Sequence, residues 1–327
     1  MSESVAIPPR RSAVVFNPIK VDVRRLKSAV IDAAAAAGWS EPAWLPTTVD
    51  DAGQALTRQA IANGAELVLA AGGDGTVRAV AESLRGSGVP LGLIPTGTGN
   101  LLARNLAIPL NTIEAAAAVA YADSQRAIDI GVATLTTDSG EQVEHAFLVM
   151  AGLGLDAALI ANTNPGLKSK FGWLAYVDAG MRSLPKLGKV RVTFAIDDTN
   201  EHTAHMSTIL VANCGSLPGN IQLFPDARVD DGRLDVAVMQ PRSLFGWLLI
   251  WRKVTWENRV LRRSSFGRRI IKLTSGRRQA VISYLRGQAV TLRVTDPEPF
   301  EIDGDEFGMV TVARLAVDPG ALYVKSR

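Results

Sequence analysis

The stretch AELVLAAGGDGTVRAVAESL, residues 65–84, joins a short apolar run to a helical pattern through a glycine-rich turn. ELVLA predicts a buried strand, and Val77–Arg85 predicts a helix. Gly72, Gly73 and Gly75 lie in the turn between them, where backbone N–H groups can approach a bound ligand. A strand that passes directly into a helix is typical of a parallel sheet, and such sheets bind ligands at the carboxyl ends of their strands.

The same alternation of strand and helix extends over the first 130 residues. The apolar runs AVVF and LGLI, at 13–16 and 91–94, contain no polar residue, as expected for strands that are covered on both faces. Helical patterns separate the runs. For the alanine-rich helix that follows the last run, Asn111 and Glu114 predict a capping box. These features together predict an α/β domain.

After Asp129 the sequence changes to short alternating segments, among them KVRVTFAI, LDVAVM and AVTLRV. Period-two alternation between glycine, proline and aspartate turns predicts an antiparallel sandwich or barrel. Helical insertions interrupt it around 170–184 and 244–262. We therefore expect an α/β domain over residues 10–129 and an all-β domain over residues 130–327.

A second glycine-rich turn follows the next predicted strand, in LGLIPTGTGNLLARNL at residues 91–106. Two such turns at neighbouring strand ends, with Asn17 and Pro18 at a third, predict one phosphate-binding site. Neither turn matches the P-loop or the GxGxxG dinucleotide fingerprint, so the site is a nucleotide site of another kind. Asp74 would repel phosphate unless a divalent cation lay between them. The alternative is a tight turn in which Asp74 is a capping residue.

The two turns carry a family resemblance. GGDGTVRAV, followed at this spacing by IPTGTGNLLAR, resembles the diacylglycerol kinase catalytic domain, which bacterial lipid kinases, sphingosine kinases and ceramide kinases share. The resemblance continues through AIDIGVA, AGLGLDAALI and KFGWLAYVDAGMRSL to ILVANCGSLPGNIQLFPDARVDDGRLDV and FEIDGDEFG. Order and spacing are similar to those of the small bacterial diacylglycerol kinases.

The resemblance implies a parallel-sheet nucleotide domain similar to that of NAD kinase and diacylglycerol kinase, a C-terminal antiparallel β-sandwich for the lipid substrate, and a site in the cleft between them. The spacing leaves open whether Thr47 or Thr48 matches the family's threonine. The residues that the resemblance assigns to ATP binding are Asn17, Pro18, Thr47, Gly72, Gly73, Asp74, Gly75, Thr76, Gly97, Thr98 and Asn100.

Phosphoryl transfer to an alcohol needs charge neutralisation at the phosphate and a base for the hydroxyl proton. The resemblance assigns the first role to Mg²⁺ with Asp74. It assigns the second to Asp305, which stands where the family commonly has Glu, and Glu306 is the alternative base. Without the family context, IDGDEFG would be interpreted as an acidic hairpin turn. Asp129 matches a residue that orients the lipid hydroxyl, and its alternative is an ordinary aspartate at a strand end.

A second Mg²⁺ site is implied in VDDGRLDV. There Asp231 would bind through its carboxylate, with only the backbone carbonyls of Arg228 and Arg233 as further ligands because guanidinium groups cannot ligate a cation. An Asp-Gly turn without metal is the equally favoured alternative.

The charge distribution indicates an anionic surface as a partner. The whole chain carries +3, yet Arg252–Arg286 contains eleven Lys or Arg residues and one acidic residue, Glu257. Trp247 and Trp251 recur at helical spacing just before this basic cluster, which is typical of a helix that lies at the surface of an anionic membrane. The alternative is a helix that packs on the sandwich while its arginine stems cover apolar surface. No nucleic-acid-binding motif accompanies the cluster.

Cellular location follows from what the sequence lacks. One cysteine, Cys214, favours a reducing compartment, and no apolar run has the ~20 residues of a spanning helix. No signal peptide is evident at the start of the sequence. We expect a cytoplasmic protein that is peripheral at the membrane. The family resemblance also suggests a homodimer.

The sequence therefore predicts an ATP- and Mg²⁺-dependent lipid kinase, most simply one that converts diacylglycerol to phosphatidic acid. Two alternatives remain. An NAD kinase shares the GGDGT turn and the two-domain plan. A nucleotide- and lipid-binding regulator with little turnover would explain the Asp at position 305.

Overall fold

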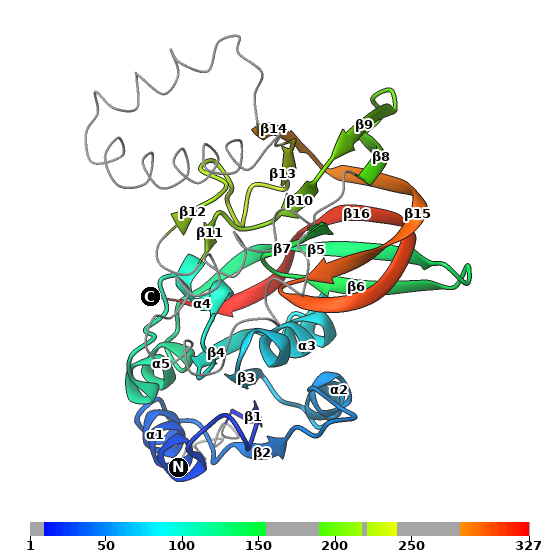
Figure 1. The fold of residues 1–327 in the computed structure, drawn as a ribbon. Helices are drawn as coiled ribbons and strands as arrows, with labels where there is room; N and C mark the ends of the chain where they lie inside the picture. The colour runs from blue at the N-terminus through cyan, green and yellow to red at the C-terminus, as the bar shows by residue number, and fades with distance from the viewer. Residues whose placement is uncertain (1–9, 155–189, 218–220, 241–281, 327) are drawn as a thin grey trace, which may run out of the picture. The chain divides into compact units, whose positions relative to one another are not determined.

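The structure is a computed structural model that describes residues 10–154, 190–217, 221–240 and 282–326 (Figure 1). The chain divides into two compact units. The first consists of Met1–Ile130 together with Pro319–Arg327, and the second of Gly131–Asp318. The chain therefore leaves the first unit once and returns to it at the C-terminus.

The first unit contains a parallel sheet. Its strands are β1 (Ser12–Phe16), β2 (Ala43–Pro46), β3 (Leu67–Gly72) and β4 (Leu91–Pro95). β1 pairs in parallel with both β2 and β3, and β3 pairs in parallel with β4. Every residue of β1 and β3 is buried, which confirms strands that are covered on both faces.

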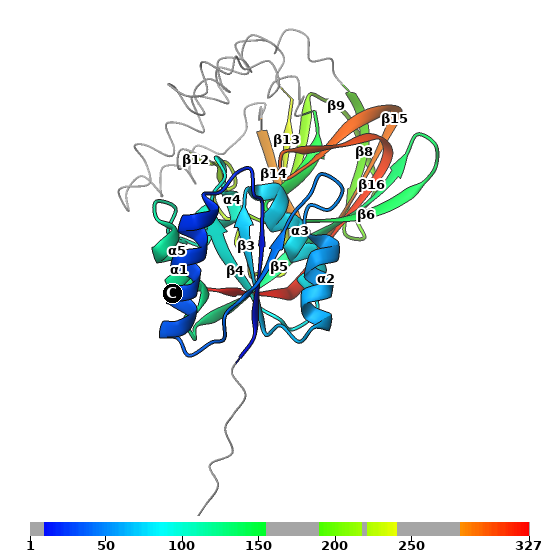
Figure 2. The same cartoon turned by 90° about the horizontal axis from the view of Figure 1, so that it is seen from below.

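Five helices accompany these strands: α1 (Val23–Ala36), α2 (Gln54–Ala62), α3 (Asp74–Leu84), α4 (Leu101–Asn105) and α5 (Ile113–Ala120). Figure 2 shows α1 and α5 on one side of the strands β1, β3 and β4, with α2 and α3 on the other side. The face beneath α1 and α5 is packed with apolar side chains: Leu26, Val30 and Ala34 of α1 recur every fourth residue and belong to one core with Val14, Leu69 and Ile94 of the strands.

The predicted capping box at Asn111 is wrong by one residue. Thr112 is the N-cap of α5, and its hydroxyl accepts a hydrogen bond from the N–H of Ala115. The Glu114 side chain is not needed for the cap and instead forms two hydrogen bonds, of 2.8 and 2.9 Å, with Arg25 of α1. This ion pair joins the two helices that cover the same face of the sheet.

The C-terminal segment completes the first unit. Strand β16 (Asp305–Lys325) begins in the second unit, and its end pairs in parallel with β4 through Val324 and Leu91. The ammonium group of Lys325 is buried and donates to the backbone oxygen of Ala122 at 2.8 Å. Burial lowers the pKa of this lysine. The sequence predicted these last residues to lie in the second domain, and no motif in them signals the return.

In its described residues the second unit consists of antiparallel strands. The helical insertions predicted around 170–184 and 244–262 lie outside these residues. Its elements are β5 (Gln125–Thr137, which starts in the first unit), β6 (Gln142–Phe147), β7 (Met150–Leu153), β8 (Val190–Ile196), β9 (His202–Met206), β10 (Thr208–Ala212), β11 (Ser216–Leu217), β12 (Ile221–Gln222), β13 (Leu234–Met239), β14 (Ile282–Gly287), β15 (Ala289–Ile302) and most of β16. The order of hydrogen-bonded neighbours runs β14, β13, β10, β7, β15 and then β16, with β8 on the other part of β15.

One apolar core holds these strands together. Phe147, Phe300 and Ile209 are fully buried within it, beside leucines and valines from most of the strands. Gly131 of β5 lies directly against the ring of Phe147, where a methyl group would come within 2.1 Å of a ring carbon. The predicted antiparallel domain is therefore confirmed for the described part of the chain.

Candidate active site

The loops that follow the four parallel strands meet at one edge of the sheet. Phe16 pairs with Pro46, and Gly72 pairs with Pro95, so the strands end at the same level. Backbone hydrogen bonds continue past the strand ends, since the N–H of Asn17 donates to Ala71 at 3.1 Å. The N–H of Thr47 donates likewise to Phe16, at 2.9 Å, and that of Thr96 to Gly72, at 3.1 Å. The residues that the resemblance assigns to ATP lie on these loops or where the loops adjoin the end of β3 and the start of α3.

The two glycine-rich loops contact each other through their backbones. A methyl group on Gly97 would lie 2.6 Å from Cα of Gly73, a distance that real side chains do not allow. A methyl group on Gly99 would lie 2.5 Å from Oδ2 of Asp74. Glycine is therefore required at these positions by the packing of one loop on the other, which brings the backbones of the two loops together.

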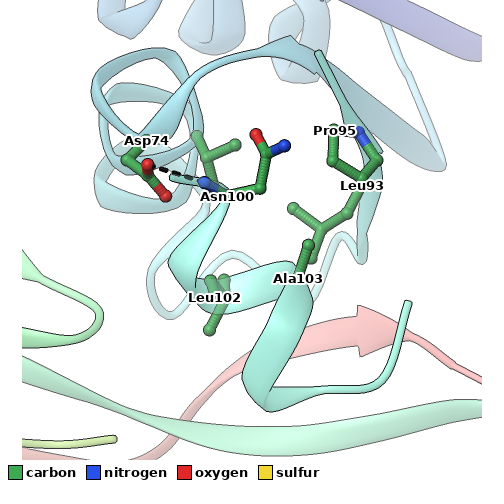
Figure 3. Close-up of a pocket in the computed structure, with 7 residues that line it drawn as sticks. Asp74, Leu93, Pro95, Asn100, Leu102 and Ala103 are labelled. Atoms are coloured by element: carbon green, nitrogen blue, oxygen red, sulfur yellow. Dashed lines mark hydrogen bonds between the residues drawn. The ribbon is translucent and has the colours of Figure 1, made fainter. Parts of the chain in front are cut away.

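Asp74 connects the two loops. Its Oδ2 accepts a hydrogen bond of 2.9 Å from the N–H of Asn100 (Figure 3). Its Oδ1 accepts one of 2.6 Å from the N–H of Leu101. These are the first amides of α4, so the carboxylate of the first loop caps the helix that follows the second loop. The capping alternative left open by the sequence thus matches the observed geometry, although the capped helix is a distant one. A role of Asp74 toward Mg²⁺ stays a prediction.

Asn100 gives the second loop its shape. Its backbone is left-handed, with φ of 48°, a conformation that asparagine tolerates better than most residues. Its side chain closes the loop, because Oδ1 accepts from the N–H of Gly97 at 3.0 Å and Nδ2 donates to the oxygen of the same residue at 2.8 Å. The buried Asn100 side chain is therefore a scaffold for the loop.

A pocket opens at this junction, and Figure 3 shows that side chains of α3, β4 and α4 converge on it. The lining residues are Asp74, Val77, Leu93, Pro95, Asn100, Leu102 and Ala103. Most of them are apolar, and the polar groups come from the two residues that tie the loops together. The arrangement provides a fixed polar edge beside apolar side chains.

Lys20 and Thr96 also lie at this edge, and the sequence did not predict a role for them. A methyl group on Gly73 would lie 3.9 Å from the ammonium nitrogen of Lys20, so this exposed cation stands beside the GGDGT loop. The Asn-Pro turn holds it there, because the N–H of Lys20 donates to the oxygen of Asn17 at 3.1 Å. The hydroxyl of Thr96 is buried in the second loop and has no hydrogen-bond partner among the described residues. The sequence signal that could have identified Lys20 is its place two positions after the Asn-Pro pair, close to a predicted phosphate site.

The threonines considered for ATP binding differ in their exposure and hydrogen bonding. Thr76 is buried and its side chain fills the space above Gly72, where a methyl group would come within 2.6 Å. Thr98 is exposed on the second loop. The hydroxyl of Thr48 accepts a hydrogen bond from the N–H of Asp51 at 3.1 Å, whereas Thr47 is buried directly after β2.

Asp129 lies on β5 and is 3% exposed. Its Oδ1 accepts a hydrogen bond of 2.8 Å from the N–H of Gly320, within the first unit. This contact gives Asp129 a structural role in holding the returning C-terminal segment. Its assignment to the lipid hydroxyl stays a prediction.

Asp305 and Glu306 are exposed at the start of β16 in the second unit. They follow a tight hairpin in which Ile302 pairs with Asp305 and Glu301 with Glu306. The acidic hairpin turn is therefore real, and it presents two neighbouring carboxylates on an extended strand. Such neighbours point to opposite faces, so one position and not both can serve a given substrate.

The predicted Asp231 metal site lies before β13. Oδ2 of Asp231 accepts a hydrogen bond of 2.8 Å from Arg286, which also contacts Asp235 at 3.2 Å and the backbone oxygen of Asp226 at 2.7 Å. Burial raises the pKa of Asp235. Oδ1 of Asp231 is buried and has no hydrogen-bond partner in the described structure, which fits a metal ligand. Among described residues, no three His, Cys, Asp or Glu side chains are grouped to hold a metal ion.

The predicted membrane-binding segment falls almost entirely outside the described residues. Trp247, Trp251 and the cluster from Arg252 are in that part of the chain. Arg286, the end of the cluster, is described, and its charge is paired with Asp231 and Asp235. No helix within the described ranges has the length and apolar character needed to cross a membrane.

Comparison with known proteins finds two family models that match successive parts of the chain. Residues 11–133 match the diacylglycerol kinase catalytic domain, and residues 148–256 match the YegS C-terminal NAD kinase beta sandwich-like domain. The chain is 34% identical over 224 residues to a protein of Pseudomonas fluorescens named "Probable lipid kinase YegS-like", a match that spans 67% of this chain and 70% of that protein.

A second relative matches over nearly the whole length. It is named diacylglycerol kinase, comes from Bacillus subtilis, and is 27% identical over 306 residues, which span 92% of this chain and 91% of the relative. Among solved structures, a diacylglycerol kinase from Bacillus anthracis is similar with a TM-score of 0.73 and 20% identity, covering 97% of each chain. That likeness shows a shared fold.

Proposed function

This chain belongs to the YegS-like lipid kinase family, and on that basis we propose that it transfers the γ-phosphoryl group of ATP to a hydroxyl of a membrane lipid, with diacylglycerol as the acceptor. One observation supports the nucleotide role most directly. Asp74, Asn100 and the facing glycines fix two glycine-rich loops against each other at the carboxyl edge of a parallel sheet.

The triphosphate would bind along the two loops. Backbone N–H groups of the loops, other than those of Thr96, Gly97 and Asn100 that already donate within the protein, would donate to phosphate oxygens. Glycine at positions 73 and 97 keeps side chains out of the way. Lys20 would add a positive charge beside the first loop. The unpartnered hydroxyl of Thr96 would donate a hydrogen bond to an oxygen of the triphosphate. Mg²⁺ carried by ATP would neutralise phosphate charge.

Asp305 would act as the base. Its carboxylate takes the proton of the acceptor hydroxyl while the hydroxyl oxygen forms a bond to the γ-phosphorus. The bond between that phosphorus and the oxygen bridging to the β-phosphate breaks, and ADP leaves with both electrons of the broken bond. A phosphomonoester lipid is the other product. With diacylglycerol as acceptor, that product is phosphatidic acid.

We also propose that Asp231 binds a structural Mg²⁺ together with the backbone oxygens of Arg228 and Arg233. The buried and unpartnered Oδ1 supports this role. A thermal unfolding series with added MgCl₂ tests it: the midpoint should rise in the wild type and stay constant in Asp231→Asn. Equal rises in both proteins would contradict the site.

Access to a lipid acceptor requires contact with a bilayer. We propose that Trp247, Trp251 and the Arg252–Arg286 cluster provide it, in a protein that is peripheral at the cytoplasmic face and forms a homodimer. Flotation with anionic and neutral vesicles, before and after raising the salt concentration, measures the electrostatic part of this contact.

A direct assay tests the main proposal. The protein is incubated with radiolabelled ATP, Mg²⁺ and mixed micelles of diacylglycerol and phosphatidylglycerol, and the products are extracted into organic solvent. Labelled phosphatidic acid is expected from the wild type, with a rate lowered about 100-fold or more in Asp305→Ala. Asp138→Asn, an exposed acid in the β5–β6 hairpin, is the matched control and should keep its full rate.

The other outcomes separate the alternatives. Labelled lipid with Asp305→Ala still active and Glu306→Ala inactive would transfer the base to Glu306. Phosphorylation of NAD in place of lipid would identify an NAD kinase. ATP binding without label in any acceptor would favour the regulator.

A further inference from the structure

Asp303 is a buried carboxylate beside the candidate base. It is 7% exposed, yet its oxygens accept three backbone hydrogen bonds: from Leu148 at 2.9 Å, from Val149 at 2.9 Å and from Met150 at 3.0 Å. A buried carboxylate charge is costly unless hydrogen-bond donors stabilise it, and three backbone amides do so here. The sequence pattern would place Asp303 at the tip of an exposed turn. In the structure its buried side chain anchors that turn to residues 148–150.

The backbone around Asp303 has a shape that depends on this anchor. Asp303 and Gly304 both have positive φ, of 50° and 89°, as a two-residue hairpin turn requires. The N–H of Asp303 also donates to the oxygen of Met150 at 2.8 Å. Asp305 follows the turn directly, so the direction of its side chain is set by how the turn is held.

The segment that receives Asp303 is itself rigidly held. Leu148 and Val149 are each 2% exposed. The oxygen of Leu148 accepts from the side-chain amide of Asn213 and from the thiol of Cys214, both at 3.2 Å. The oxygen of Val149 accepts from the N–H of Asn213 at 2.8 Å. Asn213 and Cys214, which directly follow β10, thus fix the segment from one side while Asp303 binds its amides.

We propose that Asp303 is a positioning residue that holds the hairpin so that Asp305 meets the acceptor hydroxyl in one orientation. The inference rests on the proposed function of Asp305 as the base. Asp303 itself takes no proton in this scheme, because its oxygens are engaged by the amides of the 148–150 segment. It acts only through the place that it gives to Asp305.

Asp197 provides a matched control in the same unit. It also has positive φ, of 51°, and its Oδ1 accepts backbone hydrogen bonds from Gln288 at 2.7 Å and Ala289 at 2.9 Å. The two aspartates therefore share backbone shape and bonding. They differ in burial, since Asp197 is exposed, and in position, since only Asp303 stands two residues before the candidate base.

The test compares Asp303→Asn with Asp197→Asn in the full-length protein. Asparagine keeps the size of the side chain but turns one acceptor oxygen into an NH₂ donor that faces a backbone amide. We expect Asp303→Asn to lower kcat about tenfold to 100-fold while KM for ATP changes less than about twofold, because a misplaced base slows chemistry without affecting nucleotide binding. Asp197→Asn should lose stability in urea unfolding and keep its kcat.

A double-mutant cycle distinguishes positioning from general damage. Once Asp305 is replaced by alanine, Asp303→Asn should lower kcat no further. Additive losses, a rise of KM with unchanged kcat, or an equal loss in Asp197→Asn would each overturn the inference. If Asp305→Ala keeps full activity, the proposed base fails, and a loss in Asp303→Asn alone would overturn positioning through Asp305.

Amide hydrogen exchange tests the hydrogen bonds of Asp303 without depending on catalysis. Amide hydrogen exchange at Leu148, Val149 and Met150 should be slow in the wild type and faster in Asp303→Asn, with no change in Asp197→Asn. If the wild type phosphorylates no acceptor, the proposed function fails on its own, and unchanged exchange would separately overturn the anchor.

Discussion

The carboxylate of Asp74 accepts a hydrogen bond of 2.9 Å from the backbone N–H of Asn100, so the first glycine-rich loop holds the second. The two residues are 26 positions apart in the sequence. Through this contact the position of α4 depends on a side chain that belongs to α3. Any ligand that binds one loop is thereby linked to the shape of the other.

Replacement of Asp74 should weaken ATP binding even without metal. Asp74→Ala removes the acceptor for two amides of α4, which for a helix cap costs about 1 kcal/mol, and it releases the second loop. The Kd for ATP in EDTA, measured by calorimetry, should rise about fivefold or more. Asp22→Ala, which removes the N-cap of α1, should lower stability without changing the Kd. An effect of Asp74→Ala that appears only with Mg²⁺ would instead assign Asp74 to the metal.

Gly97→Ala should disturb the site through a backbone clash. The added methyl group would lie 2.6 Å from Cα of Gly73, so the loops must move apart. Such overpacking costs about 1 kcal/mol or more in folding free energy. We expect weaker ATP binding and a lower unfolding midpoint. Gly140→Ala in the β5–β6 hairpin, where φ is 84° and space is open, should lower the midpoint only. Unchanged ATP affinity in Gly97→Ala would contradict the close packing of the loops.

Lys20→Gln should raise KM for ATP about tenfold, because a charge-assisted hydrogen bond to phosphate contributes about 1.5 kcal/mol or more. The effect should shrink as salt is added. Lys27→Gln is the control, since Lys27 stacks on the ring of Trp44 at 5.4 Å and has no assigned role at the site. Steady-state kinetics at two salt concentrations would show the difference, and equal KM values for both variants would remove Lys20 from the phosphate site.

The Arg25–Glu114 pair should make stability depend on pH in the acidic range. The hydrogen bond from Arg25 lowers the pKa of Glu114 from 4.5 to about 2 in the folded protein. Since the folded state keeps this carboxylate ionised more readily than the unfolded state, its contribution is complete above pH 4.5 and is lost as the pH falls toward 2. Urea unfolding from pH 6 to pH 2.5 should give a shallower pH dependence in Glu114→Gln. Parallel curves would contradict the pair.

The sequence predicted the parts of the fold that depend on local pattern. Uninterrupted apolar runs such as AVVF became buried parallel strands, and the turn at Gly72 passes into a helix as expected. The loops predicted to bind ATP lie at one sheet edge because parallel strands end on the same side. The alternation of strands and helices along the chain implies parallel strands, and parallel strands place the loops that follow them at the same edge. A single sequence contains this information.

The contacts that depend on distant partners could not be predicted. The Asp-Gly pair at 303–304 has the pattern of an exposed turn, and only the amides of 148–150 make Asp303 an anchor. Arg286 counts as part of a basic cluster in the sequence, whereas the fold pairs it with Asp231 and Asp235. Asp74 looked like a phosphate-site acid, and its bonds to Asn100 and Leu101 become visible only when both loops are folded.

The return of the C-terminal strand makes the second unit an insertion within the first. A fragment that stops at residue 130 would contain all of β1 to β4, yet it would lack Val324 beside Leu91 and would expose the N–H and C=O groups of that edge of β4. Such an unpaired edge is a template for aggregation. A gene encoding the first unit alone would therefore need residues 319–327 joined after residue 130 by a short linker, because the unit is discontinuous in the chain.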